Sequence, residues 1–186
     1  MTESLDDLIE ETSKHVRVMS LYPKLFKRKE LQHLHEFMDR ALYNSLCLLD
    51  TLVALKHLRA SIESNNEFEA NYFARITALH VRESLDNLNN FHGKNFRDSI
   101  ADMVGQESLI EIDAWVKALK SLKKRCFPML TEIRHNVIAH KTANGLEQVR
   151  VIRSVDAGKI GEIGWEAADS QFNLLAEYVR LIERLP

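Results

Sequence analysis

Four polar residues that could take part in catalysis lie within seven positions of one another, in the segment EIRHNVIAHKTANG. They are Arg134, His135, Asn136 and His140. Histidine titrates near neutral pH and can move a proton, whereas the arginine guanidinium offers a fixed fork of donors that suits a phosphate. Together these types suit transfer at a phosphodiester. His140 would move a proton of a ribose 2′-OH or of the leaving 5′-oxygen, and Arg134 would stabilise the charged transition state. Such chemistry needs no metal and cuts RNA but not DNA.

The spacing alone does not place the two key side chains next to each other. Apolar residues at helical spacing predict that His140 falls near the centre of an apolar helix stripe, with Asn136 at its edge and His135 pointing away. Arg134 then points about 120° away from His140. The two can flank one pocket if the helix loosens at His140. The alternative is an ordinary helix end, since cationic side chains there interact favourably with the dipole and the free carbonyls.

The elements that must position these residues are predicted to be helices. Only six glycines and three prolines occur in 186 residues, so long segments run without breakers. Periodicity predicts helices over about 4–20, 28–63, 68–91, 108–140 and 166–185, with Pro23 ending the first and Pro128 kinking or splitting the fourth. Residues 142–165 contain NG, the alternating LEQVRVI and three glycines, which predicts an irregular arm or a hairpin. We therefore expect one all-α domain over 1–186, an up-and-down bundle of four to five long helices with a short arm before the last helix.

The segment RHNVIAH resembles the motif of the HEPN superfamily, whose nucleolytic members carry an arginine followed at short spacing by a histidine. Here five residues separate Arg134 from His140, and His135 follows the arginine directly, where Asn is commonest in the family. The trailing Lys141 and the polar turn after it are similar to members associated with abortive phage infection and toxin–antitoxin systems. The resemblance implies a bundle of four or five helices with the motif at the end of a late helix. Outside 108–141 the resemblance is architectural only.

What the resemblance implies for function is a metal-independent endoribonuclease that needs no cofactor. Arg134 and His140 would be the catalytic pair, supported by Asn136 and His135. The chain would form a homodimer whose motifs face each other across a cleft, would act on RNA, and would have a possible antitoxin protein as a further partner. The alternative within the family is a non-catalytic dimeric binding or regulatory module. The third hypothesis is a helical bundle of another family, in which the polar residues at the end of this helix only cap it.

Three further residues are candidates for binding substrate: Lys141, Glu83 and Lys124. Glu83, with His80 and Asn87, continues an apolar stripe of its helix. The trio either lines a cleft or is solvated because the stripe rotates toward later leucines. Lys124 shares one helical face with Lys117 and Lys120, which is either a solvated face or a patch that steers RNA.

Composition narrows the remaining classes of protein. The formal charge of −2 demands neither a nucleic acid nor an anionic membrane as partner, and two cysteines do not make a disulfide framework. No motif for a metal, a nucleotide phosphate or a nucleophilic serine occurs. The acidic N-terminus lacks the pattern of a signal peptide, and no run of roughly 18 apolar residues predicts a membrane span. We therefore expect a cytoplasmic protein without a membrane partner.

Overall fold

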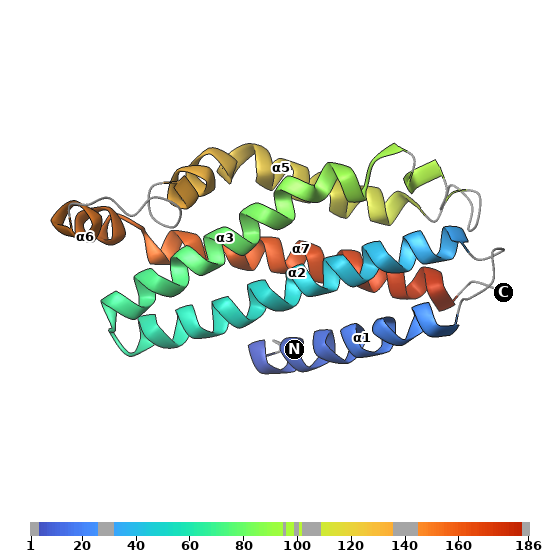
Figure 1. The fold of residues 1–186 in the computed structure, drawn as a ribbon, viewed down its shortest axis with the longest axis horizontal. Helices are drawn as coiled ribbons and strands as arrows, with labels where there is room; N and C mark the ends of the chain where they lie inside the picture. The colour runs from blue at the N-terminus through green and yellow to red at the C-terminus, as the bar shows by residue number, and fades with distance from the viewer. Residues whose placement is uncertain are drawn as a thin grey trace.

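Every regular element in the described part of the chain is a helix (Figure 1). The computed structural model describes residues 4–25, 32–94, 96–98, 101, 109–135 and 145–183. The main helices are α1 (Leu5–Leu25), α2 (Gln32–Glu63), α3 (Glu67–Phe91), α5 (Leu109–Ile133), α6 (Gly145–Arg153) and α7 (Ala157–Glu183).

The four longest helices α2, α3, α5 and α7 pack side by side and alternate in direction (Figure 1). Helix α1 lies along α2, and the short α6 stands at one end of the bundle, where it packs against α3. The prediction of an all-α up-and-down bundle is therefore confirmed.

One buried stripe on each long helix explains why the helices pack in this way. Helix α5 buries a leucine or another apolar residue at nearly every turn from Leu109 to Ile133. Helix α2 buries residues at alternating steps of three and four from Met38 to Leu55, whereas Arg59 and Ile62, which continue that spacing, are exposed. On α3 the buried face includes Leu85 and Leu88. The apolar stripe of this helix therefore rotates toward the later leucines, which was one of the two alternatives for its polar residues. Each long helix thus buries one face against its neighbours.

The turn between α2 and α3 lies where the paired asparagines predict a break. Asn65 has a φ of 54°, a left-handed conformation that asparagine tolerates better than most residues. Asn66 caps α3, since its side-chain oxygen accepts a hydrogen bond from the backbone N–H of Glu69 at 3.2 Å.

Neither proline ends a helix, so the predicted boundary at Pro23 was wrong, and of the two alternatives at Pro128 the split is excluded. Helix α1 continues through Pro23 to Leu25, and α5 is not split at Pro128. A proline in a helix removes one backbone hydrogen bond to the preceding turn. Near the end of α1, and on the exposed side of a long anchored helix, that single loss is outweighed by packing.

The predicted irregular arm or hairpin at 142–165 was also wrong over 145–153 and 157–165, which are helical; of its described residues, only 154–156 form an irregular turn. Residues 145–153 form α6, and α7 begins at Ala157 rather than near 166. The glycines that suggested a loop are spaced three apart within α7. At Gly164 an added Cβ would lie 2.7 Å from Cγ2 of Thr77 and 2.9 Å from Cδ2 of Leu55. This glycine therefore permits close contact of α7 with α2 and α3.

Candidate functional site

Arg134 lies at the end of α5, at the place where the buried stripe of that helix stops. Leu130 and Ile133 are buried and anchor the last turn against the bundle. Arg134 follows half-buried, and His135 is exposed. At these two positions the winding changes to π type, a local widening that is frequent at functional sites. The core thus holds the backbone just before Arg134, while the Arg134 side chain lies half-buried at the edge of the bundle.

The other residues of the motif cannot be placed in the same way. Asn136, His140 and Lys141 lie outside the described residues. The pairing of Arg134 with His140 therefore stays a prediction.

The neighbouring helix α3 contributes a buried cation to this end of α5. Arg82 is only 8% exposed, and its Nε donates a hydrogen bond to Oγ1 of Thr131 at 3.2 Å. Its guanidinium carbon lies 5.0 Å from the ring centroid of Phe127, and Nη1 is 3.7 Å from a carboxylate oxygen of Asp86. Thr131 precedes Arg134 by one helical turn. Arg82 therefore joins α3 to the last turn of α5.

Sequence reasoning overlooked Arg82 and singled out its neighbour Glu83. Glu83 is exposed and acts on Tyr43 and Cys47 of α2: burial raises the pKa of both groups, and the negative charge of Glu83 adds a smaller effect in the same direction. The two residues differ by about 100° around α3, which is enough to turn them to different neighbours. One available signal was the spacing of Arg82 from Asp86, which suits an ion pair on one helix face.

The other two members of the polar trio on α3 face α2. Asn87 donates a hydrogen bond from Nδ2 to the hydroxyl of Tyr43 at 2.8 Å. His80 Nδ1 lies 3.9 Å from a carboxylate oxygen of Asp50. These contacts account for the polar side of α3 as part of the α2–α3 packing.

The basic run on α5 separates into paired and exposed residues. Lys123 lies 3.4 Å from a carboxylate oxygen of Asp86 and stacks on the ring of Phe127, and Arg125 pairs with Glu166. In contrast, the three lysines predicted to share one helical face are all exposed: Lys117, Lys120 and Lys124. We name these three the lysine face; it leads along α5 toward Arg134.

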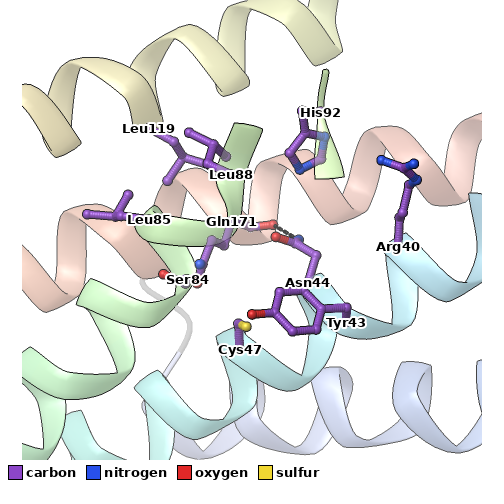
Figure 2. Close-up of a pocket in the computed structure, with 10 residues that line it drawn as sticks. All are labelled: Arg40, Tyr43, Asn44, Cys47, Ser84, Leu85, Leu88, His92, Leu119 and Gln171. Carbon is purple, nitrogen blue, oxygen red and sulfur yellow. Dashed lines mark hydrogen bonds between the residues drawn. The ribbon is translucent and has the colours of Figure 1, made fainter. Parts of the chain in front are cut away.

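A second group of polar residues is buried between α2, α3 and α7 (Figure 2). Asn44 donates a hydrogen bond from Nδ2 to the backbone carbonyl of Gln171 at 3.2 Å, whereas the buried Oε1 of Gln171 has no partner among the described residues. The cavity beside them holds about 10 Å³, room for a single water. This volume is far below that of a ligand pocket, so the cluster is part of the folded core.

His92 closes one end of this polar cluster and is kept neutral there. Its Nδ1 lies 2.7 Å from the hydroxyl of the fully buried Tyr178. Burial, together with the positive charges of Arg40 and Lys120, lowers the pKa of His92 to about 4. Burial likewise raises the pKa of Tyr178 well above its usual value. At neutral pH the pair is an uncharged hydrogen bond inside the bundle.

A larger, apolar cavity of about 360 Å³ lies between α1, α2 and α7. Leu55, Leu58 and Trp165 contribute to its walls, and Arg59 on its edge is paired with Glu63 at 2.7 Å. It brings together no pair of acid and base groups that could transfer a proton.

Metal ligands do not gather in the described residues: no three His, Cys, Asp or Glu side chains there lie close enough to share an ion. Within the same part of the chain, no helix combines the length and the apolar character needed to cross a membrane.

Comparison with known proteins identifies no relative from which a role for the bundle or for the end of α5 could be taken. No protein-family model matches the chain, and no significant match was found among curated proteins or solved structures.

Proposed function

We propose that the protein is a metal-independent endoribonuclease of HEPN type, with Arg134 and His140 as its catalytic pair. The observation that supports this best is the position of Arg134. It emerges half-buried from the anchored last turn of α5, next to the turn that Arg82 binds. Because the core fixes the backbone that carries this side chain, less freedom is lost when the guanidinium binds a phosphate, which favours transition-state stabilisation.

The reaction would be an internal transfer at phosphorus. The ribose 2′-oxygen forms a bond to phosphorus as the bond to the leaving 5′-oxygen breaks. His140 of one copy accepts the 2′-OH proton and His140 of a second copy gives a proton to the leaving oxygen, so the two motifs of a dimer complete one site. Arg134 binds the non-bridging oxygens as charge develops on them. The products are a 2′,3′-cyclic phosphate and a free 5′-hydroxyl.

Most of the remaining candidates have accessory roles in this proposal. Asn136 and His135 orient the catalytic groups. Lys141 and Lys124 contact the substrate, with Lys124 as the end of the lysine face nearest to Arg134. Glu83, the third candidate, lies on the α2 side of α3 and has no role in this proposal. Because the lysine face is exposed along α5, it could attract a phosphate backbone from a distance.

A cytoplasmic nuclease of this kind has to be restrained, and we extend the proposal to a toxin or phage-defence component held inactive by an antitoxin protein. This part rests on the resemblance of RHNVIAHK to such family members. Expression of the chain in a bacterial host tests this part: the wild-type chain should arrest growth of the host, and His140→Ala should not.

The decisive test is RNA cleavage in excess EDTA by the wild-type chain, Arg134→Lys and His140→Ala. Arg180→Ala is the matched control, because Arg180 is an exposed arginine on the last turns of α7, at the opposite end of the bundle (Figure 1). We expect cyclic phosphate ends from the wild type and the control only, and no cleavage of DNA of the same sequence. Equal cleavage by all four proteins, or cleavage that EDTA abolishes, would overturn the proposal. RNA binding without cleavage would instead favour the non-catalytic binding module.

A further inference from the structure

Helix α3 carries a row of large side chains on the flank that faces α5. Phe68, Tyr72, Arg75, Leu79 and Arg82 recur at alternating steps of four and three, so they share one helical face. We name this row the α3 flank. Its orientation is known at Arg82, which bonds Thr131 of α5.

The first turns of the α3 flank extend past the described end of α5. The helices run in opposite directions, because Arg82 contacts Thr131 while Asp86, one turn later, contacts Lys123. Moving back along α3 therefore leads toward and beyond Arg134. From Leu79 to Phe68 is eleven positions, or about 16 Å of helix. This part of the flank lies at the same end of the bundle as α6 and the end of α5 (Figure 1).

Two aromatic rings stand exposed on this part of the flank. Phe68 is 60% exposed and Tyr72 is 49% exposed, although both are large enough to be buried by preference. The ring of Tyr72 is held from two sides: it meets Phe73 edge to face at 5.2 Å, and the guanidinium carbon of Arg75 lies 5.5 Å from its centroid. Phe73 is in turn stacked on His57 at 4.8 Å. The Tyr72 ring is thus ordered while about half of the residue stays exposed.

Cations accompany these rings on both helices nearby. Arg75 anchors its Nε on the backbone carbonyl of Asn71 at 3.2 Å, which directs a guanidinium to the surface beside Tyr72. On α6, Arg153 lies 3.9 Å from a carboxylate oxygen of Glu67 at the start of α3, which brings a second arginine to this end of the flank but pairs it with a carboxylate. Ordered rings next to arginines are the combination by which proteins bind unpaired nucleotides, since bases stack on the rings and phosphates meet the cations.

We infer that the α3 flank is a binding surface for single-stranded RNA, on which unpaired bases stack on Tyr72 and Phe68 while the backbone runs toward Arg134. The inference rests on the proposed ribonuclease function and adds the conformation of the substrate that the site accepts. Duplex RNA keeps its bases stacked on one another, so it cannot use the rings and gains only from the phosphate contacts.

Binding can be tested apart from cleavage with a probe that lacks the nucleophile. Fluorescence anisotropy would follow a labelled 2′-O-methyl RNA of twelve nucleotides, single-stranded or annealed to its complement, on the full chain. Tyr72→Leu removes the ring and keeps an apolar side chain, Tyr72→Phe keeps the ring, and Phe68→Leu repeats the test one turn away. Ile110→Ala is the control at an exposed apolar residue, 64% exposed, on the first turn of α5.

The expected result is an affinity for the single strand that falls about 5- to 30-fold in Tyr72→Leu and Phe68→Leu. Tyr72→Phe and Ile110→Ala should stay within about twofold of wild type, and the duplex should not distinguish the variants. Unchanged single-strand affinity in both leucine variants overturns the inference. The inference is also overturned if the leucine variants lose self-association in sedimentation while their RNA affinity is unchanged, because the α3 flank would then bind a second copy of the chain.

Cleavage of unmodified RNA by the same proteins separates the two proposals. Cleavage without any effect of the leucine variants leaves the ribonuclease standing and removes the stacking surface. Binding that depends on the rings, without cleavage, leaves the stacking surface standing and removes the ribonuclease. A wild-type chain that binds no RNA contradicts both.

Discussion

Arg82 on α3 donates a hydrogen bond from Nε to Oγ1 of Thr131 on α5, three residues before Arg134. The guanidinium also lies over the ring of Phe127 and near Asp86, so four side chains join the two helices at this point. The first prediction concerns this bond. Thr131→Val keeps the shape of the side chain but leaves the donor of Arg82 without its acceptor. We expect the free energy of unfolding to fall by about 1–3 kcal/mol, measured by urea denaturation.

Thr131→Ser is the control, because it keeps the acceptor, and it should retain most of the stability. If the bond also positions Arg134, Thr131→Val lowers kcat for RNA more than it raises KM. A valine variant as stable as wild type would mean that the bond contributes nothing.

A second prediction concerns the contact of α7 with α2 and α3. Gly164→Ala places a methyl group 2.7 Å from Cγ2 of Thr77 and 2.9 Å from Cδ2 of Leu55, closer than packed carbon atoms approach. We expect a loss of about 1–3 kcal/mol in the free energy of unfolding because α7 has to shift. Gly158→Ala is the matched control, because Gly158 is exposed and an added Cβ would lie no closer than 3.5 Å to its nearest neighbour, Oδ1 of Asp156. That variant should be as stable as wild type or slightly more stable.

Acid should destabilise the protein through His92. Its pKa in the folded protein is about 4, below the ordinary value of 6.5 that it regains on unfolding. The unfolded chain therefore binds the proton first, and stability falls as the pH drops from about 6.5 to about 4. The full effect is about 3 kcal/mol. Urea denaturation at pH 7, 6, 5 and 4.5 measures it.

His92→Gln serves as the comparison for this pH effect, since it removes the titrating group while the acidic residues still titrate. The difference in stability between wild type and variant should shrink, or change sign, toward low pH. A difference that stays constant with pH would show that His92 has the same pKa in the folded and the unfolded protein, and would contradict the prediction.

The lysine face should dominate the salt dependence of RNA binding. Each phosphate contact to a single strand contributes about −0.7 to the slope of log K against log salt. Replacing Lys117, Lys120 and Lys124 by glutamine should reduce that slope by about 2 units, measured by anisotropy between 50 and 300 mM salt, roughly the range over which the phosphate term acts. A second triple variant at the exposed Lys14, Lys56 and Arg180 removes the same charge elsewhere and should leave the slope close to that of wild type.

Helix positions were predictable from the sequence where one periodic stripe is long and breakers mark its ends. The start of α3 is such a case, since Asn65 and Asn66 provide the turn and the cap. The start of α7 was missed because Gly161 and Gly164 suggest a loop unless their neighbours are known. Only the packed structure reveals that Leu55 and Thr77 lie where a side chain at position 164 would otherwise stand. A glycine that permits close packing looks the same in a sequence as one in a turn.

The candidate site was predictable only in part, for a related reason. Arg134 stands out because it follows an apolar stripe directly, and the structure does place it at the edge of the bundle. The contribution of α3 could not be predicted in the same way. Arg82 and Glu83 are adjacent, and which of them faces α5 depends on how α3 is rotated in the bundle. That rotation follows from the packing of all four helices and not from α3 alone.

We propose that Arg134 and His140 cleave RNA without a metal ion. The most direct test incubates single-stranded RNA with wild-type protein and with His140→Ala in excess EDTA and follows the release of 2′,3′-cyclic phosphate ends. We predict cleavage by the wild type and a loss of about 10²- to 10⁴-fold in rate for His140→Ala, the usual effect of removing a general acid or base. Cleavage at the same rate by both proteins would contradict the account, as would a complete absence of cleavage by the wild type.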